Sequence, residues 1–419
     1  MYKKTTLENG LRIITVPQKE TQAATVLILV KTGSKYETKD ISGISHFLEH
    51  MIFKGTEKRK GPMEVAEELD KVGGEFNAFT GEEYTGYYAK VNYTNFDIAL
   101  DWVSDIFLNS KIPSKEMQKE RGVIIEEINM YKENPIMYIG DLWKNLLYGD
   151  QPAGWDIAGT KETVLGIERK DIKKYISDHY VAKNTIVCVA GKIKEEDVIE
   201  KIKGYFSNIA KTDPKDKIKV IEKQENPQIK ILYKKGNQTN LALGVRGYEM
   251  THPQRFTMDV LSVILGGMMS SRLFREVREK LGAAYHVRTY NYCDTDTGSL
   301  VTFAGVDNEK LKKVIETILK EYNNIKKKRV PDSELKKAKE YLKGKIVLRM
   351  ESSDAQASFY GAQELLKNEV LSMEEIFKRI DKVTADDIIA VAKDIFREDR
   401  LNLALIGPFK NKEEFNLKI

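Results

Sequence analysis

The sequence predicts an α+β protein built from two duplicated domains, each a mostly antiparallel β-sheet covered by α-helices. The chain has 419 residues, which is enough for two or three domains with buried cores. Short apolar runs in clusters alternate irregularly with long amphipathic stretches, a pattern typical of α+β domains. The second half of the chain also repeats the pattern of the first at a constant offset, which indicates duplication.

The composition is that of a folded, soluble protein with no bias toward nucleic acid. Hydrophobic residues make up 41% and charged residues 31% of the chain. The net charge is +5, from 68 basic and 63 acidic side chains, and Lys and Glu interleave along helical stretches such as Glu309–Lys328. Such stretches are typical of solvated faces, so we expect no nucleic-acid partner.

The expected location is the cytoplasm, with no membrane contact, and the alternative is an organelle protein whose presequence has been removed. Cys188 and Cys293 are too few for a disulfide framework. The N-terminal segment lacks an apolar signal core and carries Glu8, an acid that a transit peptide would avoid. The longest apolar run, Ala23–Val30, is far shorter than the ~20 residues of a membrane span.

Strands of the first half are expected where apolar runs follow turn signals. The turn Asn9–Gly10 precedes Leu11–Val16, and a polar stretch precedes Ala23–Val30; we expect these two strands to be neighbours in one sheet. The other expected strands are Phe76–Phe79, Tyr84–Val91 and Thr185–Ala190.

Helices of the first half are marked by their start and stop residues. One helix follows Ser42–Gly43 and should end near Lys54–Gly55. Another, Pro62–Val72, has proline in its first turn and Gly73–Gly74 at its end. The remaining expected helices are amphipathic and cover Asn95–Asn109, Ser114–Asn134, Met137–Tyr148 and Lys170–His179.

A linker divides the chain. The segment from Lys211 to Gln228 is rich in Lys, Asp, Glu and Pro and has little apolar periodicity. We therefore expect an N-terminal domain at 1–212, a linker at 213–227 and a C-terminal domain at 228–419. The expected elements of the second half are strands Ile229–Tyr233, Leu241–Val245 and Leu401–Ile406, a helix Pro253–Leu265, and several further helices.

The internal repeat is clearest at the end of each half. With an offset of 216 residues (387 − 171), Asp171 matches Asp387 and Gly191 matches Gly407. The shared pattern is a helix, a short connection, an apolar strand and a glycine. Duplication of one domain explains this pattern.

Five residues, His46-Phe47-Leu48-Glu49-His50, form the motif H-x-x-E-H. In a helix, His46 and His50 lie on one face a turn apart, so that both imidazoles can reach one cation. Zinc prefers such donors in a roughly tetrahedral site with one position open for water. Glu49 can then act as the general base for that water, and this order of residues is that of the inverted zinc-peptidase motif. The alternative is a helix whose histidines bind no metal.

A third ligand is expected on the helix Ser114–Asn134. Glu120 and Glu127 are seven positions apart and share a face of that helix. Apolar residues lie among its glutamates, so part of the helix is buried, and a buried carboxylate needs a partner such as a cation. Spacing alone does not decide whether Glu126 or Glu127 is the ligand. The alternative is that all the glutamates of this helix are solvated.

The second half carries no such motif. It contains His252 and His286, but neither is paired with a glutamate at helical spacing. We therefore expect no catalytic zinc there and a different role for that half.

Two longer segments extend the motif into a family resemblance. GISHFLEHMIFKGT and, downstream, ERGVIIEEINMYKENP resemble the zinc peptidases that include pitrilysin, insulin-degrading enzyme and the mitochondrial processing peptidase. The resemblance covers nearly the whole chain. It implies one Zn²⁺ per chain, with the third ligand 77 positions after His50, at Glu127, and an active-site acid at Glu120.

Two further segments extend the resemblance. The stretch NAFTGEEYTGYYAKV resembles the family's edge strand and its partner, which implies substrate binding by Asn77, Ala78 and Phe79. The stretch LGGMMSSRLFREVREKLGAAY resembles an arginine-tyrosine element, which implies that Arg278 and Tyr285 hold substrate near the metal. Without the resemblance, Arg278 would be an exposed helix arginine and Tyr285 a buried strand tyrosine.

The functional hypothesis is a zinc-dependent metalloendopeptidase that hydrolyses short or unfolded peptides, with Glu49 as general base. The expected catalytic residues are Glu49 and, as the resemblance implies, Glu120, Arg278 and Tyr285. The chain resembles, in length, bacterial-type family members in which each chain forms one half of the enzyme and two chains work as a dimer. We expect a homodimer in which Arg278 and Tyr285 act in trans. The alternatives are a non-catalytic core or scaffold subunit, and one subunit of a heterodimeric processing peptidase.

Overall fold

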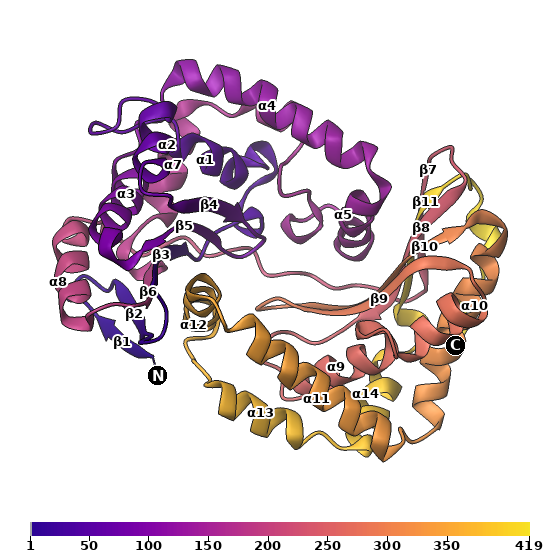
Figure 1. Ribbon diagram of the computed structural model, residues 1–419. Coiled ribbons are helices and arrows are strands. Elements are labelled where there is room, and N and C mark those ends of the chain that lie inside the picture. Colours follow the sequence, from indigo (N-terminus) through magenta and orange to yellow (C-terminus); the bar gives the residue numbers. More distant parts are fainter. Residues whose placement is uncertain (1) are drawn as a thin grey trace. The chain divides into compact units, whose positions relative to one another are not determined.

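The computed structural model describes residues 2–419, which form two compact units with one β-sheet each (Figure 1). Of the described residues, the first unit contains 2–129, 155–218 and 348–371, and the second contains 130–154, 219–347 and 372–419. The expected α+β class with two sheets is confirmed. The units differ from the expected domains 1–212 and 228–419 in two segments. Residues 130–154 belong to the second unit, and residues 348–371 belong to the first.

The first sheet has six strands in the order β1-β2-β6-β3-β5-β4. All neighbouring pairs are antiparallel except β2 with β6. β4 lies at one edge of the sheet and pairs with β5 along its length, from Glu75 opposite Lys90 to Thr80 opposite Thr85. The strands are β1 (Lys3–Thr6), β2 (Arg12–Pro17), β3 (Ala23–Val30), β4 (Glu75–Thr80), β5 (Thr85–Asn92) and β6 (Thr185–Gly191).

Helices cover both faces of the first sheet. One face packs into a core with α1, α2, α3, α7 and α8, centred on side chains such as Val26, Phe47 and Trp102. The opposite face packs against α12. The helices are α1 (Ile44–Ile52), α2 (Pro62–Asp70), α3 (Phe96–Asn109), α4 (Ser114–Glu133), α6 (Lys161–Gly166), α7 (Arg169–His179), α8 (Glu195–Phe206) and α12 (Ser353–Lys367).

The second sheet has five strands in the order β7-β11-β8-β10-β9, with only β7 and β11 parallel. Helix α5 packs on one face, and α9, α10 and α14 are among the other helices of this unit. The strands are β7 (Gln228–Tyr233), β8 (Gln238–Arg246), β9 (Ala284–Cys293), β10 (Gly298–Asp307) and β11 (Leu401–Gly407). The helices are α5 (Pro135–Tyr148), α9 (Arg255–Ser262), α10 (Leu311–Lys327), α11 (Asp332–Arg349), α13 (Met373–Asp381) and α14 (Ala385–Ile395).

The two sheets share one topology. When β1 is set aside, the order β2-β6-β3-β5-β4 and the order β7-β11-β8-β10-β9 both place the last strand second and the third strand at the edge. In both sheets the single parallel pair joins the first and last of these strands. This common order agrees with the duplication inferred from the repeat.

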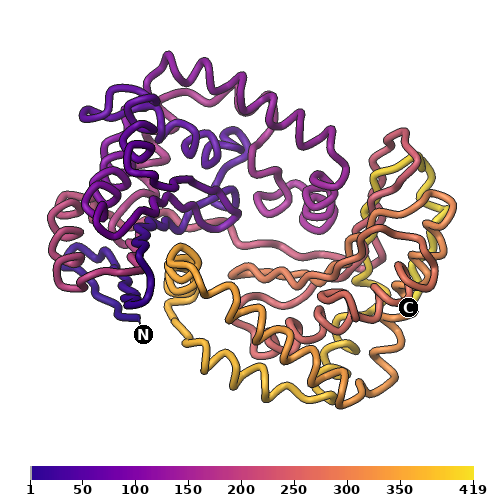
Figure 2. The backbone as a smooth tube through the Cα atoms, in the orientation of Figure 1, coloured from indigo at the N-terminus to yellow at the C-terminus, as the bar shows by residue number. Residues whose placement is uncertain are grey.

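Each half of the chain gives one helix to the other unit. α12 comes from the C-terminal half and packs on β3 and β6 of the first sheet, which Figure 2 shows as a late segment beside early strands. α5 comes from the N-terminal half and packs on β8 and β11 of the second sheet. The exchange adds a covering helix to a face of each sheet.

Some expected elements differ from the structure. The strands β2 and β3 are not neighbours, because β6 lies between them. The five residues 18–22 between them are long enough to pass one strand position of ~4.8 Å. The expected helix Pro253–Leu265 is α9 followed by a π-helical turn at Val263–Gly267. The hairpin formed by β9 and β10 was not expected.

Candidate metal centre

Helix α1 presents both histidines of the motif. It begins at Ile44, after Gly43 in a left-handed conformation with φ +94°, and it ends at Ile52. Its apolar residues Phe47, Leu48 and Met51 are fully buried, so packing fixes the rotation of the helix. The rings of His46 and His50 consequently lie side by side, with centroids 4.7 Å apart.

Glu127 of α4 meets the two imidazoles. Its Oε2 lies 3.6 Å from Nε2 of His46 and 3.4 Å from Nε2 of His50. Two ligands bound about 2.05 Å from a tetrahedral ion are roughly 3.3 Å apart, so these separations fit zinc. Within residues 2–419, these three residues are the one group of this kind that could hold a metal, with ligand atoms within 4.8 Å of one another. Glu126, which spacing left as an alternative, is exposed.

Glu120 holds His50 from the other side. Its Oε2 lies 3.0 Å from Nδ1 of His50, and its Oε1 lies 2.6 Å from Nζ of Lys54. A carboxylate on Nδ1 fixes the tautomer that leaves Nε2 free to bind a metal. Glu120 itself is buried, and Lys54 balances its charge.

Burial and neighbouring charges shift the pKa values of all three expected ligands. Burial, together with the neighbouring His50, lowers the pKa of His46 to about 4, which keeps its imidazole neutral. Burial also acts on the pKa of His50, but Glu127 and Glu120 outweigh it and raise that pKa. The hydrogen bond from His50 lowers the pKa of Glu127, which favours its carboxylate form. Zinc binds imidazoles in their neutral form, so a metal bound through Nε2 would displace the proton that the two carboxylates favour on His50.

Glu49 points toward the edge strand. Its Oε2 accepts a hydrogen bond of 2.5 Å from the hydroxyl of Thr80, the last residue of β4. Burial raises the pKa of Glu49, and the Thr80 and His50 contacts oppose that rise. A carboxylate with a raised pKa is better matched to proton transfer near neutral pH.

The expected substrate strand is the edge of the first sheet. Asn77, Ala78 and Phe79 all belong to β4. Asn77 is exposed and its Oδ1 accepts the N–H of Ala78 at 2.9 Å, whereas the Ala78 side chain is buried. An edge strand has backbone groups available for one more strand.

Arg278 and Tyr285 lie in the second unit and contact each other. The guanidinium carbon of Arg278 lies 5.3 Å from the ring centre of Tyr285 and 4.8 Å from that of Phe274. Tyr285 is 81% exposed, so it is not the buried strand tyrosine considered from sequence. An exposed tyrosine beside an arginine has its hydroxyl free for a ligand.

Sequence reasoning missed two side chains at the centre, Lys54 and Thr80. Lys54 lies four residues after His50, just beyond the end of α1, and this spacing could have identified it. Thr80 is 31 positions from Glu49, and no local pattern links them.

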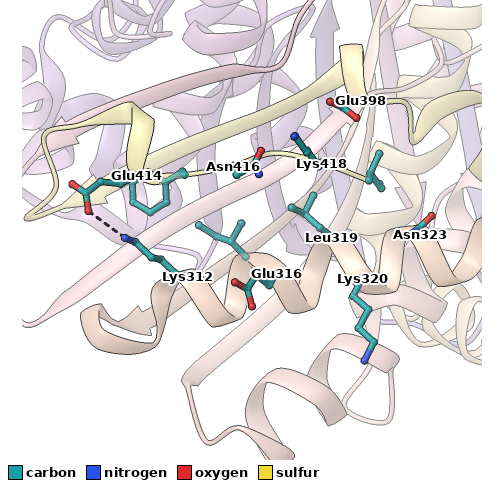
Figure 3. A pocket seen from close by; sticks show the side chains of 12 residues that line it. Lys312, Glu316, Leu319, Lys320, Asn323, Glu398, Glu414, Asn416 and Lys418 are labelled. Carbon is teal, nitrogen blue, oxygen red and sulfur yellow. Dashed lines mark ion pairs between the residues drawn. The ribbon is translucent and has the colours of Figure 1, made fainter.

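A cavity of about 710 Å³ lies in the second unit, between α10 and the C-terminal residues 414–419. Figure 3 shows its lining, in which Lys312 pairs with Glu414 at 3.5 Å. None of the described residues that line it is a histidine or a cysteine, so it offers no second centre of the same chemistry.

Two family models match most of this chain. Residues 12–161 match the model described as Insulinase (Peptidase family M16), and residues 166–342 match the model described as Peptidase M16 inactive domain. The chain belongs to the M16 peptidase family.

Relatives of this M16 chain agree over its full length. The "Uncharacterized zinc protease YmxG" of Bacillus subtilis (strain 168) is 36% identical, with 98% of this chain and 99% of that protein covered. A protease from Helicobacter pylori has a crystal structure with a TM-score of 0.90 and 27% identity, covering 97% and 99% of the two chains. A Pseudomonas fluorescens structure, described as a peptidase M16 inactive domain, has a TM-score of 0.89, 17% identity and 98% coverage of both chains, which shows the fold alone.

None of the helices within residues 2–419 is long and apolar enough to cross a membrane.

Proposed function

We propose that this chain is a zinc metalloendopeptidase that cleaves short or unfolded peptides. The observation that carries the proposal is the convergence of His46, His50 and Glu127, with ligand atoms within 4.8 Å of one another. Glu49 stands one residue before His50 on the same helix. The names of the curated relatives, zinc proteases, support the same activity.

Three residues would hold one zinc ion: His46 and His50 through Nε2, and Glu127 through its carboxylate. When bound, zinc supplies Lewis acidity, which lowers the pKa of a water molecule toward about 7 and polarises a carbonyl group. Glu120 orients His50 through Nδ1, and Lys54 holds Glu120 in place.

Glu49 performs the proton transfers. As general base it takes a proton from the attacking water, and it then gives a proton to the nitrogen of the departing amine. The hydrogen bond from Thr80 directs its Oε2 and ties it to the end of β4. The raised pKa of Glu49 favours both halves of this transfer.

The peptide would bind as an added strand at β4, through the backbone of Asn77, Ala78 and Phe79. Main-chain pairing accepts many side-chain sequences, and it requires an extended substrate. Selection for short or unfolded peptides follows from this requirement. Because Thr80 ends this strand and contacts Glu49, an added peptide lies next to the general base.

Arg278 and Tyr285 would bind the substrate backbone or the developing negative charge on the carbonyl oxygen. We propose that they act in trans, with the protein as a homodimer. The exposure of Tyr285 and its contact with Arg278 support a role in binding a ligand.

The test compares purified wild-type protein with Glu49→Gln in cleavage of an unstructured peptide, and zinc content is measured on both. Glu49→Gln should bind the same amount of zinc and cleave about 10²- to 10⁴-fold more slowly. Equal cleavage rates would remove Glu49 as base. A wild-type protein that binds zinc and cleaves no peptide would favour the non-catalytic scaffold, and activity only after addition of a second, different chain would favour the heterodimeric enzyme.

A further inference from the structure

The start of α1 lacks a capping side chain of its own. Gly43 occupies the N-cap position with φ +94°. A Cβ atom there would lie 2.6 Å from the carbonyl oxygen of Ala158, so no serine, threonine or aspartate fits. The first N–H groups of the helix must therefore find their acceptors elsewhere.

Glu37, six residues earlier, provides both acceptors. Its Oε2 accepts the N–H of Gly43 at 2.7 Å, and its Oε1 accepts the N–H of Ser45 at 2.9 Å. The side chain is 1% exposed, so water does not compete for these bonds. An acidic group at this end of a helix also interacts favourably with the helix dipole.

The capped turn is the one that carries the first histidine. His46 directly follows Ser45, whose hydroxyl bonds to Tyr175 at 2.7 Å. Helices fray from their ends, so loss of the cap affects this first turn before the second turn with His50. Glu37 touches neither imidazole and reaches His46 through the backbone of α1.

Residues 33–37, the segment that contains Glu37, also bind the turn that follows the edge strand β4. The N–H of Ser34 donates to Gly81 at 3.2 Å, and that of Lys35 donates to Glu82 at 2.9 Å. The ammonium of Lys35 forms a buried ion pair of 3.0 Å with Glu83. Residues 33–37 thus hold the turn between β4 and β5 at one end and the start of α1 at the other.

We propose that Glu37 is a positioning residue for the metal site: it caps the first turn of α1 and thereby strengthens zinc binding through His46. This inference rests on the proposed function, because it requires that His46 binds the metal.

The experiment measures the zinc dissociation constant of the purified full chain by competition with a chromophoric chelator. Glu37→Gln preserves the size of the side chain but places an NH₂ group against one of the two N–H donors. Its zinc dissociation constant should rise on the order of tenfold, as expected for loss of a cap near a ligand. Amide hydrogen exchange at residues 43–48 should become faster in the same variant.

Glu364→Gln is the matched control. Glu364 is 2% exposed, belongs to the same unit, and accepts hydrogen bonds from Lys4 and Arg12 far from α1 in sequence. Its substitution has the same chemistry and should leave the zinc dissociation constant unchanged. Glu37→Asp retains both acceptor oxygens and the charge, so it should lose less affinity, and it serves if Glu37→Gln does not fold.

The outcomes separate this inference from the proposed function. Wild-type protein that binds zinc, with an unchanged constant in Glu37→Gln, would overturn the role of Glu37 alone. An equal loss in Glu364→Gln would also overturn it, because the effect would then be general destabilisation. Wild-type protein that binds no zinc would overturn the metal site, and the role of Glu37 with it.

Discussion

At the proposed metal centre, some residues would bind the ion and others would orient those ligands. His50 shows both kinds of contact, because its Nε2 faces Glu127 and its Nδ1 faces Glu120. Glu120 is in turn bound to Lys54 at 2.6 Å. Such outer contacts raise the affinity of a site by holding ligands in their bound orientation.

Replacement of Glu120 should therefore weaken metal binding without touching the ligand set. We expect Glu120→Gln to raise the zinc dissociation constant about 10- to 100-fold. Glu126→Gln, an exposed change on the same helix, should have no effect. Competition titration with a chelator measures both. Equal constants for the two variants would contradict the role of Glu120.

The pKa of Glu37 leads to a separate prediction about how the free energy of unfolding depends on pH. Burial raises its pKa from 4.5 to about 7, against the opposing hydrogen bonds from Ser45 and Gly43. A raised folded-state pKa gives stability that is present below pH 4.5 and lost as the pH rises through about 7. Relative to Glu37→Gln, wild-type protein should lose up to about 3 kcal/mol of unfolding free energy across this range.

Denaturant unfolding of the metal-free proteins at a series of pH values measures this difference. A difference between wild type and Glu37→Gln that stays constant with pH would show that the Glu37 carboxyl does not titrate in this range.

Among the elements, α12 shows how sequence encodes close packing. Ser353, Ala357 and Gly361 recur every four residues, so small side chains line one face of the helix, and all three are buried. Ser353 bonds to Thr25 of β3 at 2.8 Å. A Cβ atom on Gly361 would lie 2.4 Å from Sγ of Cys188 and 2.8 Å from Leu29.

Gly361→Ala should therefore destabilise the first unit by about 1 to 3 kcal/mol through overpacking. Cys188→Ala, added as a second substitution, should recover part of this loss because it removes the sulfur. Gly344→Ala in α11 is the control, since no atom lies within 4 Å of its added Cβ, and it should be neutral or stabilising by up to about 1 kcal/mol. Thermal or denaturant unfolding gives these values. A fully stable Gly361→Ala variant would contradict the packing of α12 on this sheet.

At the scale of the whole molecule, features that depend on local sequence patterns were predicted better than features that depend on contacts between distant residues. The α+β class agrees with the pattern of apolar runs, and helical spacing placed His46 and His50 on one face. Only the family resemblance singled out Glu127, which lies beside both histidines. The exchange of α5 and α12 was not predicted, because an amphipathic helix does not specify which sheet it covers. Thr80 was missed because its contact with Glu49 depends on how the strand meets the helix, which no local pattern specifies.

The proposed homodimer makes a prediction about mixed variants. If Arg278 and Tyr285 act in trans, Glu49→Gln and Tyr285→Phe, each inactive alone, should complement each other. Random exchange of subunits gives a heterodimer with one intact site, so about a quarter of the sites should be active. Peptide cleavage after subunit exchange measures the recovery. No recovery, with exchange verified, would contradict action in trans.

The most direct test of the central claim is titration of zinc into metal-free protein while cleavage of an unstructured peptide is followed. We predict that activity rises linearly to one zinc per chain and then stays constant. Glu127→Gln should require much more zinc for any activity, and Glu49→Gln should bind one equivalent and remain inactive. Full cleavage by the metal-free wild type, or undiminished cleavage by Glu49→Gln, would contradict the assignment of this centre as a zinc peptidase site.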